Sequence, residues 1–321
     1  MCSWRRPRRD CSTSSSSCGC SHDRGRQSGC RFRLPESLAL AQAKEVLSSP
    51  EASSLQTSLK NVVIDRPGMD IHRYASRIGY VEEARPTLEV LCALQESHLL
   101  AVPFENLDIH AGRRIVLDER ALFEKIVVRK RGGFCYELNG LFHLLLKAVG
   151  FDVKLLMGRV YDRGRSSYGP AFDHLLIMAM VDGEQWLVDV GFGDFVLQPL
   201  KFMLNQPLPD RNGQFSIERH DDEYFRISRY APEEGRFSPE YLFSLQERTL
   251  SDFSNMCHYH QTSPDSHFTS RRICSIATAT GRITLTDQKL IVTEGKTRTE
   301  VIIRNRSDFA EALARYFDMV P

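Results

Sequence analysis

The stretch Arg131–Asn139, RGGFCYELN, constrains this chain most, because it joins a sharp turn to the start of a helix. Its two adjacent glycines let the backbone turn tightly and come close to another group. From Cys135 onward, apolar residues recur at three- and four-residue steps, which predicts one apolar helix face, and Gly150 supplies a stop. The apolar positions are Leu138, Leu141, Phe142, Leu145, Leu146 and Val149.

Cys135 is predicted to lie in the first turn of that helix. Unpaired backbone N–H groups and the positive end of the helix dipole favour the thiolate there, and the thiolate is the nucleophilic form. The alternative is that Cys135 is simply the first residue of the buried stripe, because free cysteine is among the most buried residue types. On this stretch alone, both interpretations stand.

Two downstream segments favour the nucleophile. Residues 172–178, FDHLLIM, predict a loop entering an apolar strand with His174 near its start. Residues 186–193, WLVDVGFG, predict a second strand that carries Asp189 and ends in a glycine-rich turn. The Asp182-Gly183 pair between them is a tight-hairpin signal. His174 and Asp189 are therefore expected on paired strands, in the chain order Cys, His, Asp of an activated thiol.

Each of these two residues also has a plainer interpretation. A lone histidine before a strand is more often a surface residue or a satisfied core residue than a catalytic one. Asp189 is more unusual, because a carboxylate inside an apolar run needs a partner. His174 is the nearest candidate in the hairpin, and a purely structural ion pair would satisfy Asp189 as well.

Five motifs along Met69 to Pro321 resemble those of the arylamine N-acetyltransferases and occur in the same order. They are MDIHRY with IGY at residues 69–80, VPFENL at 102–107, RGGFCYELN at 131–139, VDVGFG at 188–193, and QTSPDSHF at 261–268, followed by Cys274-Ser275 and the strands up to Thr293. Any one of these motifs would be weak evidence, whereas five in order are specific.

The resemblance implies an α+β fold with a papain-like Cys-His-Asp core in three domains. These are a helical domain at 69–155, a β-barrel-like domain at 156–255 and an α/β lid at 256–321, after a tail at 1–68. Helices gathered before strands independently favour α+β over a doubly wound sheet.

The resemblance also implies an activity, which is transfer of an acetyl group from acetyl-CoA to the nitrogen of an arylamine or arylhydrazine. Ping-pong kinetics through an acetyl-cysteine would follow, with Cys135, His174 and Asp189 as the triad. Three alternatives stay open: an amide synthase of the same fold acting on a tethered acyl chain, a Cys-His-Asp hydrolase or transglutaminase, and a non-catalytic binding protein.

The family pattern extends to binding residues. Tyr259, Ser266 and His267 are expected near acetyl-CoA, although His267 stands where relatives often carry a small residue. Phe104 and Phe192 are expected to form an aromatic wall for the amine, with ordinary core packing as the alternative.

Further residues around the motifs carry structural expectations. Glu105 and Arg131 are predicted to pair and brace the loop before Cys135, whose own N–H is the natural candidate for stabilising an oxyanion. The run Cys257-His258-Tyr259-His260 has metal-ligand residue types but no evident fourth ligand, so no metal is predicted.

The composition is that of a globular enzyme, with 42% hydrophobic and 26% charged residues. The 321 residues suffice for more than one domain. A net charge of +1 indicates no preference for nucleic acid or an anionic membrane, and no apolar run reaches the length of a membrane span. The partner that the family resemblance implies is a small aromatic amine or hydrazine, and the oligomeric state is left open.

The first 33 residues differ from the rest. They hold eight arginines against two aspartates, together with five of the nine cysteines. With so little to bury, residues 1–68 are predicted to be disordered and without a part in catalysis. The tail lacks the apolar segment of a secretory signal. The remaining cysteines form no regular disulfide framework, which favours a reducing, cytoplasmic setting.

Overall fold

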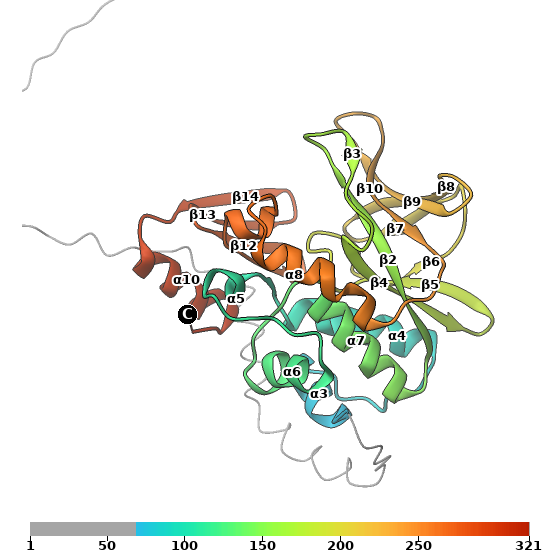
Figure 1. Ribbon diagram of the computed structural model, residues 1–321, viewed down its shortest axis with the longest axis horizontal. Coiled ribbons are helices and arrows are strands. Elements are labelled where there is room, and N and C mark those ends of the chain that lie inside the picture. Colours follow the sequence, from blue (N-terminus) through green and yellow to red (C-terminus); the bar gives the residue numbers. More distant parts are fainter. Residues whose placement is uncertain (1–68, 321) are drawn as a thin grey trace, which may run out of the picture. The chain divides into compact units, whose positions relative to one another are not determined.

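The computed structural model describes residues 69–320, which lie in one compact unit. Helices come first along this part of the chain, then strands, then helices and strands together, so the fold is mixed α and β (Figure 1). The predictions for the tail at 1–68 lie outside the described residues. The three domain boundaries within 69–320 stay predictions.

The helices of the first part begin where capping residues stand. Thr87 and Asp118 each accept a hydrogen bond from the backbone N–H three residues on, at 3.4 and 3.1 Å, as N-caps do. The helices are α3 (Ile71–Ile78), α4 (Leu88–Ala101), α5 (Leu107–His110), α6 (Glu119–Phe123), the π-helix η2 (Glu124–Val128) and α7 (Cys135–Val149).

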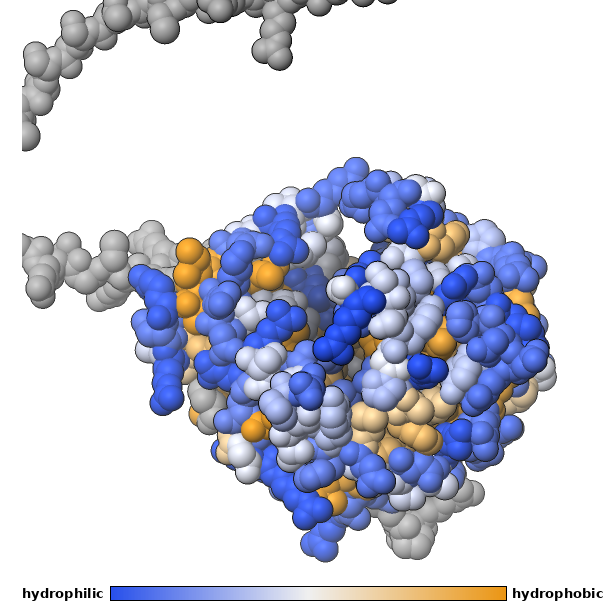
Figure 2. Space-filling view, turned by 45° about the horizontal axis from the view of Figure 1, so that its top comes forward, coloured by the Kyte–Doolittle hydropathy of each residue, from blue (hydrophilic) through white to orange (hydrophobic). Residues whose placement is uncertain are grey.

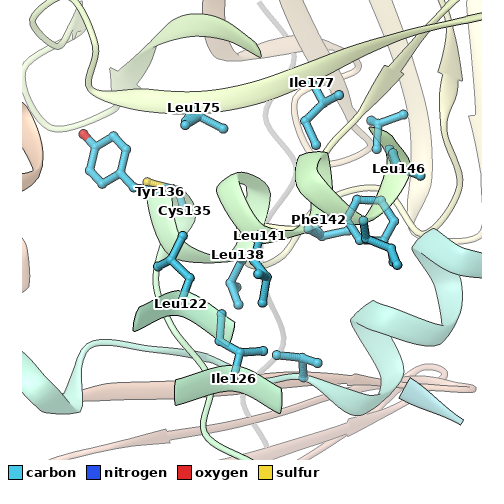
Figure 3. Close-up of a cluster of buried hydrophobic side chains, with 14 of the residues drawn as sticks. Leu122, Ile126, Cys135, Tyr136, Leu138, Leu141, Phe142, Leu146, Leu175 and Ile177 are labelled. Atoms are coloured by element: carbon cyan, nitrogen blue, oxygen red, sulfur yellow. The ribbon is translucent and has the colours of Figure 1, made fainter. Parts of the chain in front are cut away.

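Helix α7 is the centre of the main hydrophobic core. Its predicted apolar face packs between Leu122 and Ile126 on one side and Leu175 and Ile177 of a strand on the other (Figure 3). Each fully buried leucine of this kind contributes about 1.5–3 kcal/mol. Gly150 ends the helix at a φ of 107°, which confirms the predicted stop. Packing along the whole of α7 therefore also holds its first turn, which contains Cys135, in place.

An antiparallel sheet follows α7, and it is barrel-like in shape. Its path runs β6-β5-β4-β2-β10-β9-β8-β7, with β3 paired to β2. The strands are β2 (Asp152–Asp162), β3 (Ser167–Tyr168), β4 (His174–Val181), β5 (Glu184–Val188), β6 (Leu200–Lys201), β7 (Pro207–Asp210), β8 (Gly213–Arg219), β9 (Tyr224–Ala231) and β10 (Arg236–Ser244). A second core lies within this sheet and includes Phe215, Tyr241 and Phe243.

The hairpin that carries the site is formed as predicted. Strands β4 and β5 pair, with Ile177 opposite Val188. Asp182 and Gly183 occupy the turn with φ of 51° and 79°, both in the left-handed region that such a turn requires. His174 therefore begins β4, and Asp189 follows the end of β5.

For residues 237–250 the sequence predicts a turn and a helix, and this prediction is wrong, because strand β10 occupies most of that segment. Tyr241 and Phe243 are fully buried on one face of the strand, and aromatic residues favour strands. The pairing of β10 with β9 shifts register between Pro239 and Tyr241. Proline has no backbone N–H, and at this shift its absence loses no hydrogen bond between the strands. A 3₁₀-helix, η3 (Leu250–Phe253), comes only after the strand.

The last part of the chain forms a second antiparallel sheet with the order β1-β11-β12-β13-β14. It contains α8 (Ser254–Thr262), α9 (His267–Ser270), β11 (Ile273–Thr278), β12 (Gly281–Thr286), β13 (Lys289–Glu294), β14 (Thr297–Ile302) and α10 (Arg306–Phe317). The sequence predicts strands at 273–277, 282–285, 289–292 and 298–303, and all four are confirmed. It predicts Ser307 as the cap of the final helix, which is wrong by two residues, because Asn305 accepts the first N–H groups.

Strand β1 (Phe104–Glu105) connects the N-terminal helical part of the described chain to its C-terminal sheet. It belongs to the VPFENL motif but pairs with β11, with Phe104 opposite Ser275. The Glu105 N–H also donates to the Gly133 carbonyl at 2.8 Å. The turn before Cys135 is thereby linked through β1 to the C-terminal sheet.

Hydrophilic residues dominate the face shown in Figure 2, with hydrophobic residues in scattered patches. Within residues 69–320, no helix has the length and apolar character that crossing a bilayer requires.

A chain that begins at Met69 should keep full activity and a melting temperature close to that of the full chain. All site residues and both hydrophobic cores lie within residues 69–320. Thermal unfolding and turnover of the two chains, compared side by side, check this. An inactive or insoluble shortened chain would mean that residues 1–68 contribute to the core.

Candidate active site

The turn before the nucleophile depends on its glycines. A Cβ at Gly132 would lie 2.0 Å from the Pro103 carbonyl oxygen, so no other residue fits there without movement. The Gly133 N–H donates to that same carbonyl at 3.3 Å. The predicted close approach of this backbone to another group is therefore confirmed, and the partner is the segment leading into β1.

Cys135 opens helix α7 and is buried, with 4% of its surface exposed. Its neighbour Tyr136 donates from the phenol to the Phe172 and Asp173 carbonyls at 2.7 and 3.1 Å. These bonds tie the first turn of α7 to the chain entering β4. Figure 3 shows Cys135 on the side of the helix that faces Leu175 of β4.

His174 and Asp189 form the pair that the hairpin predicted. The imidazole Nε2–H donates to Asp189 Oδ2 at 2.7 Å, and each side chain is only 2% exposed. Because Nε2 holds its proton against the carboxylate, Nδ1 is the ring nitrogen that can accept a proton.

Asn139 anchors the other carboxylate oxygen. Its Nδ2 donates to Asp189 Oδ1 at 2.9 Å and to the Leu175 carbonyl at 2.6 Å. Its Oδ1 accepts from the Val190 N–H at 2.8 Å, and the Gly191 N–H donates to Asp189 Oδ1 at 2.9 Å. One amide therefore joins α7 to both strands of the hairpin.

Tyr241 of β10 supplies a fourth donor to the carboxylate, bonding Asp189 Oδ2 at 3.2 Å. Burial, reinforced by Asp189, raises the pKa of Tyr241 well above its usual range, so the phenol keeps its proton. The rings of Tyr241 and Phe192 lie 5.2 and 5.1 Å from the His174 ring. His174 thus packs against two aromatic rings that also contact each other, while Asp189 has all its acceptor sites used.

Gly191 places the end of the hairpin directly against Cys135. A Cβ there would lie 2.8 Å from the Cys135 Cα and 2.7 Å from Asn139 Nδ2. The glycine after the aspartate motif is therefore required by close approach to the first turn of α7.

The charge environment of the thiol differs from the expectation. Burial raises the pKa of Cys135 well above its ordinary value, and the carboxylates of Asp173 and Asp189 raise it further. The Leu175 backbone N–H lowers it but does not outweigh them. Burial and both carboxylates therefore oppose the thiolate that the helix terminus is predicted to favour. The thiol needs a base, and a thiolate here needs a protonated imidazole beside it.

Two of these residues were not assigned from the sequence. Asn139 carried a usable signal, because it lies four residues after Cys135 and hence on the same helix face. Tyr241 carried none, since it lies in the segment for which a helix was expected.

The phenylalanines assigned to the substrate lie in different surroundings. Phe192 contacts His174, whereas Phe104 is half-buried in β1 with its ring 6.1 Å from that of Phe268. Only Phe192 is thereby brought beside the triad residues, and both substrate assignments stay predictions.

The residues assigned to the coenzyme lie together on α8 and α9. Tyr259 is 38% exposed and His267 is exposed as well, so both can reach a ligand. Ser266 is 3% exposed, and its Oγ accepts from the Phe268 N–H and pairs with His260. Ser266 has a structural part in capping α9, and its predicted contact with coenzyme is untested.

Buried charges support the loop before Cys135. Arg131 donates to Glu105 at 2.7 Å, which confirms the predicted brace. Lys125 Nζ lies 2.8 Å from Glu137, 3.0 Å from Asp108 and 3.7 Å from Glu105. Burial opposes its charge, but these carboxylates outweigh burial and raise the pKa of Lys125. The Phe134 N–H donates to Glu137, so the network also caps α7.

Lys125→Met should destabilise the fold by about 3–5 kcal/mol, because it leaves buried carboxylates without their central cation. Denaturant unfolding measures this. Arg113→Met is the matched control: it contacts the same Asp108 from a half-exposed position, where an ion pair contributes about 0–1 kcal/mol. If the two variants lost equal free energy of unfolding, Lys125 would not be the central cation of this network.

Among residues 69–320, no three His, Cys, Asp or Glu side chains group as metal ligands. In that part of the chain, Cys92, Cys135, Cys257 and Cys274 are free thiols.

Comparison with known proteins identifies the family of this chain. The N-acetyltransferase family model matches residues 87–320. Arylamine N-acetyltransferase, pineal gland isozyme NAT-10, from Gallus gallus is 32% identical over 78% of this chain and 94% of its own length. Arylamine N-acetyltransferase 1 from Homo sapiens is 35% identical over 66% of this chain and 79% of its own length. The solved arylamine N-acetyltransferase of Salmonella typhimurium superposes with a TM-score of 0.73 at 29% identity, covering 78% of this chain and 91% of that one. The chain belongs to the arylamine N-acetyltransferase family and is an acyltransferase.

Proposed function

We propose that this enzyme transfers an acetyl group from acetyl-CoA to the nitrogen of an arylamine or arylhydrazine through an acetyl-cysteine. The observation that carries the proposal is a buried cysteine at a helix start, packed against the end of the hairpin that carries a bonded His–Asp pair, in a chain of the arylamine N-acetyltransferase family. Cys135 is the nucleophile, His174 the base and Asp189 the residue that orients it.

In the first half-reaction, His174 Nδ1 takes the proton of the Cys135 thiol as the sulfur attacks the thioester carbonyl carbon. The bond between that carbon and the coenzyme sulfur breaks, and the imidazolium returns the proton to the leaving thiolate. Asp189 stabilises the imidazolium that exists between these steps. Backbone N–H groups at the start of α7, with that of Cys135 first among them, stabilise the oxyanion.

In the second half-reaction, the amine nitrogen attacks the acetyl-cysteine carbonyl. His174 accepts a proton from the nitrogen and passes it to Cys135 as the carbon–sulfur bond breaks. The free thiol is regenerated, so the two substrates react in turn. We assign Phe192 and Phe104 to the amine, and Tyr259, His267 and Ser266 to acetyl-CoA. We place the reaction in the reducing cytoplasm, in keeping with the free cysteines.

The test is CoA release, followed with a thiol reagent, in the presence and absence of an arylhydrazine. A transferase gives one rapid equivalent of CoA per enzyme without acceptor and continuous release with it. Continuous release of CoA without acceptor would instead indicate a hydrolase. No release at all would mean that acetyl-CoA is not the acyl donor. A tethered acyl chain as the only effective donor would indicate an amide synthase.

A further inference from the structure

A second carboxylate–imidazole pair lies beside the proposed site and takes no part in the mechanism above. His260 Nε2 of α8 is 3.1 Å from Asp173 Oδ1, and His260 Nδ1 is 2.9 Å from the Ser266 hydroxyl. His260 is 3% exposed, and the Asp173 side chain is 12% exposed. Asp173 Oδ2 also accepts from the Val160 N–H at 3.2 Å.

The hydrogen bonds fix which atoms donate. An ionised carboxylate only accepts, so His260 Nε2–H donates to Asp173. Ser266 Oγ accepts from the Phe268 N–H, which leaves its own proton to donate to His260 Nδ1. A neutral His260 therefore has both ring nitrogens satisfied, and a protonated His260 can donate to Ser266 instead.

This pair is built around the first turn of α7. Asp173 directly precedes His174, and its carbonyl accepts from Tyr136, the neighbour of Cys135. The Tyr136 ring stacks on His260 with centroids 6.0 Å apart. The Asp173 carboxylate also acts on the Cys135 thiol more strongly than Asp189 does, and it opposes a negative charge there.

We propose that Asp173 and His260 are positioning residues for Cys135: His260 screens the nucleophile from the Asp173 carboxylate and ties α8 to the start of the strand that carries His174. The inference rests on the proposed function in that Cys135 is the nucleophile. Neither residue touches a reacting atom in the steps above.

Other titratable groups surround this pair, and Asp189 and Cys257 also oppose a negative charge on Cys135. His260 faces the rings of Tyr136, Tyr259 and His267. Cys135 is also affected by Asp189 and Cys257, while Asp162 and Arg271 act on His267. Changing Asp173 or His260 alone leaves all of these in place.

The test is the pH dependence of Cys135 alkylation by iodoacetamide, read from the mass of the peptide that contains Cys135. Asp173→Asn removes the opposing charge and should move the midpoint down by about one pH unit. His260→Leu leaves the carboxylate unscreened and should move it up. In the double variant, the effect of His260→Leu should vanish, so that its midpoint matches that of Asp173→Asn. If the two residues had only a structural role, their effects on the midpoint would add in the double variant, and the two single variants would not shift it in opposite directions.

The controls are Asp182→Asn in the β4–β5 turn and His258→Leu on α8, the same substitutions at exposed positions. Both should leave the alkylation profile unchanged. In turnover, His260→Leu should slow acetylation of the enzyme.

If His260→Leu fails to fold, Asp173→Asn decides alone, and an unchanged midpoint in that variant overturns the proposal. Additive shifts in the double variant overturn it as well. Alkylation does not require acetyl transfer, so expected shifts in an enzyme that releases no CoA would support the pair while contradicting the proposed function.

Discussion

We expect Cys135→Ala to lose transfer activity by about ten-thousandfold or more, with the fold intact. In the proposed mechanism the Cys135 thiol receives the acetyl group, and its Cα lies against Gly191 at the end of the hairpin that carries the His174–Asp189 pair. The other free thiols, Cys92, Cys257 and Cys274, lack this arrangement. The sulfur of Cys257 accepts from the Gln261 side-chain amide at 3.2 Å, so its hydrogen-bond partner is an amide and not an imidazole. No substitute nucleophile is therefore available.

The measurement is kcat/KM for arylhydrazine acetylation, together with thermal unfolding to show that the variant folds. Cys92→Ala is the matched control, since it removes a half-buried thiol on α4 and should keep full activity. Persistent turnover in Cys135→Ala would mean that the acetyl group passes directly from coenzyme to amine.

Asp189→Asn should lower kcat by about a hundredfold or more. Asp189 Oδ1 accepts from two donors, Asn139 and Gly191, that cannot reverse their direction. The new amide nitrogen must therefore take the Oδ2 position, where His174 and Tyr241 can act as acceptors. An amide N–H donating to Nε2 forces the ring proton onto Nδ1, so His174 can no longer accept the thiol proton.

This variant keeps the volume of the side chain, so its loss should appear in kcat while thermal unfolding shifts little. Asp182→Asn, at the exposed turn of the same hairpin, is the control and should match the unchanged enzyme. Near-normal kcat in Asp189→Asn would assign the carboxylate to structure alone.

The residues that could be predicted from the sequence are those whose positions follow from patterns in the nearby chain. The helix that starts at Cys135 follows from its apolar spacing and its flanking glycines. The hairpin that pairs His174 with Asp189 follows from the Asp-Gly turn, since a two-residue turn fixes the register of its strands. Short-range geometry therefore sufficed to predict the pair.

The parts that were missed depend on long-range pairing. Tyr241 reaches Asp189 only because β10 pairs with β2, and no local pattern indicates that contact. His260 and Asp173 are 87 positions apart, so their bond also needs the tertiary fold. The same holds for the thiol: its pKa is set by burial and by carboxylates that the fold brings close, which the sequence near Cys135 does not contain.

The most direct measurement is the mass of the enzyme after incubation with acetyl-CoA and no acceptor, followed by peptide mapping. The proposed mechanism predicts one added acetyl group per chain, located on the peptide that contains Cys135, and its loss when an arylhydrazine is added. An enzyme that stays unmodified while it turns over, or an acetyl group on a residue other than Cys135, would contradict it.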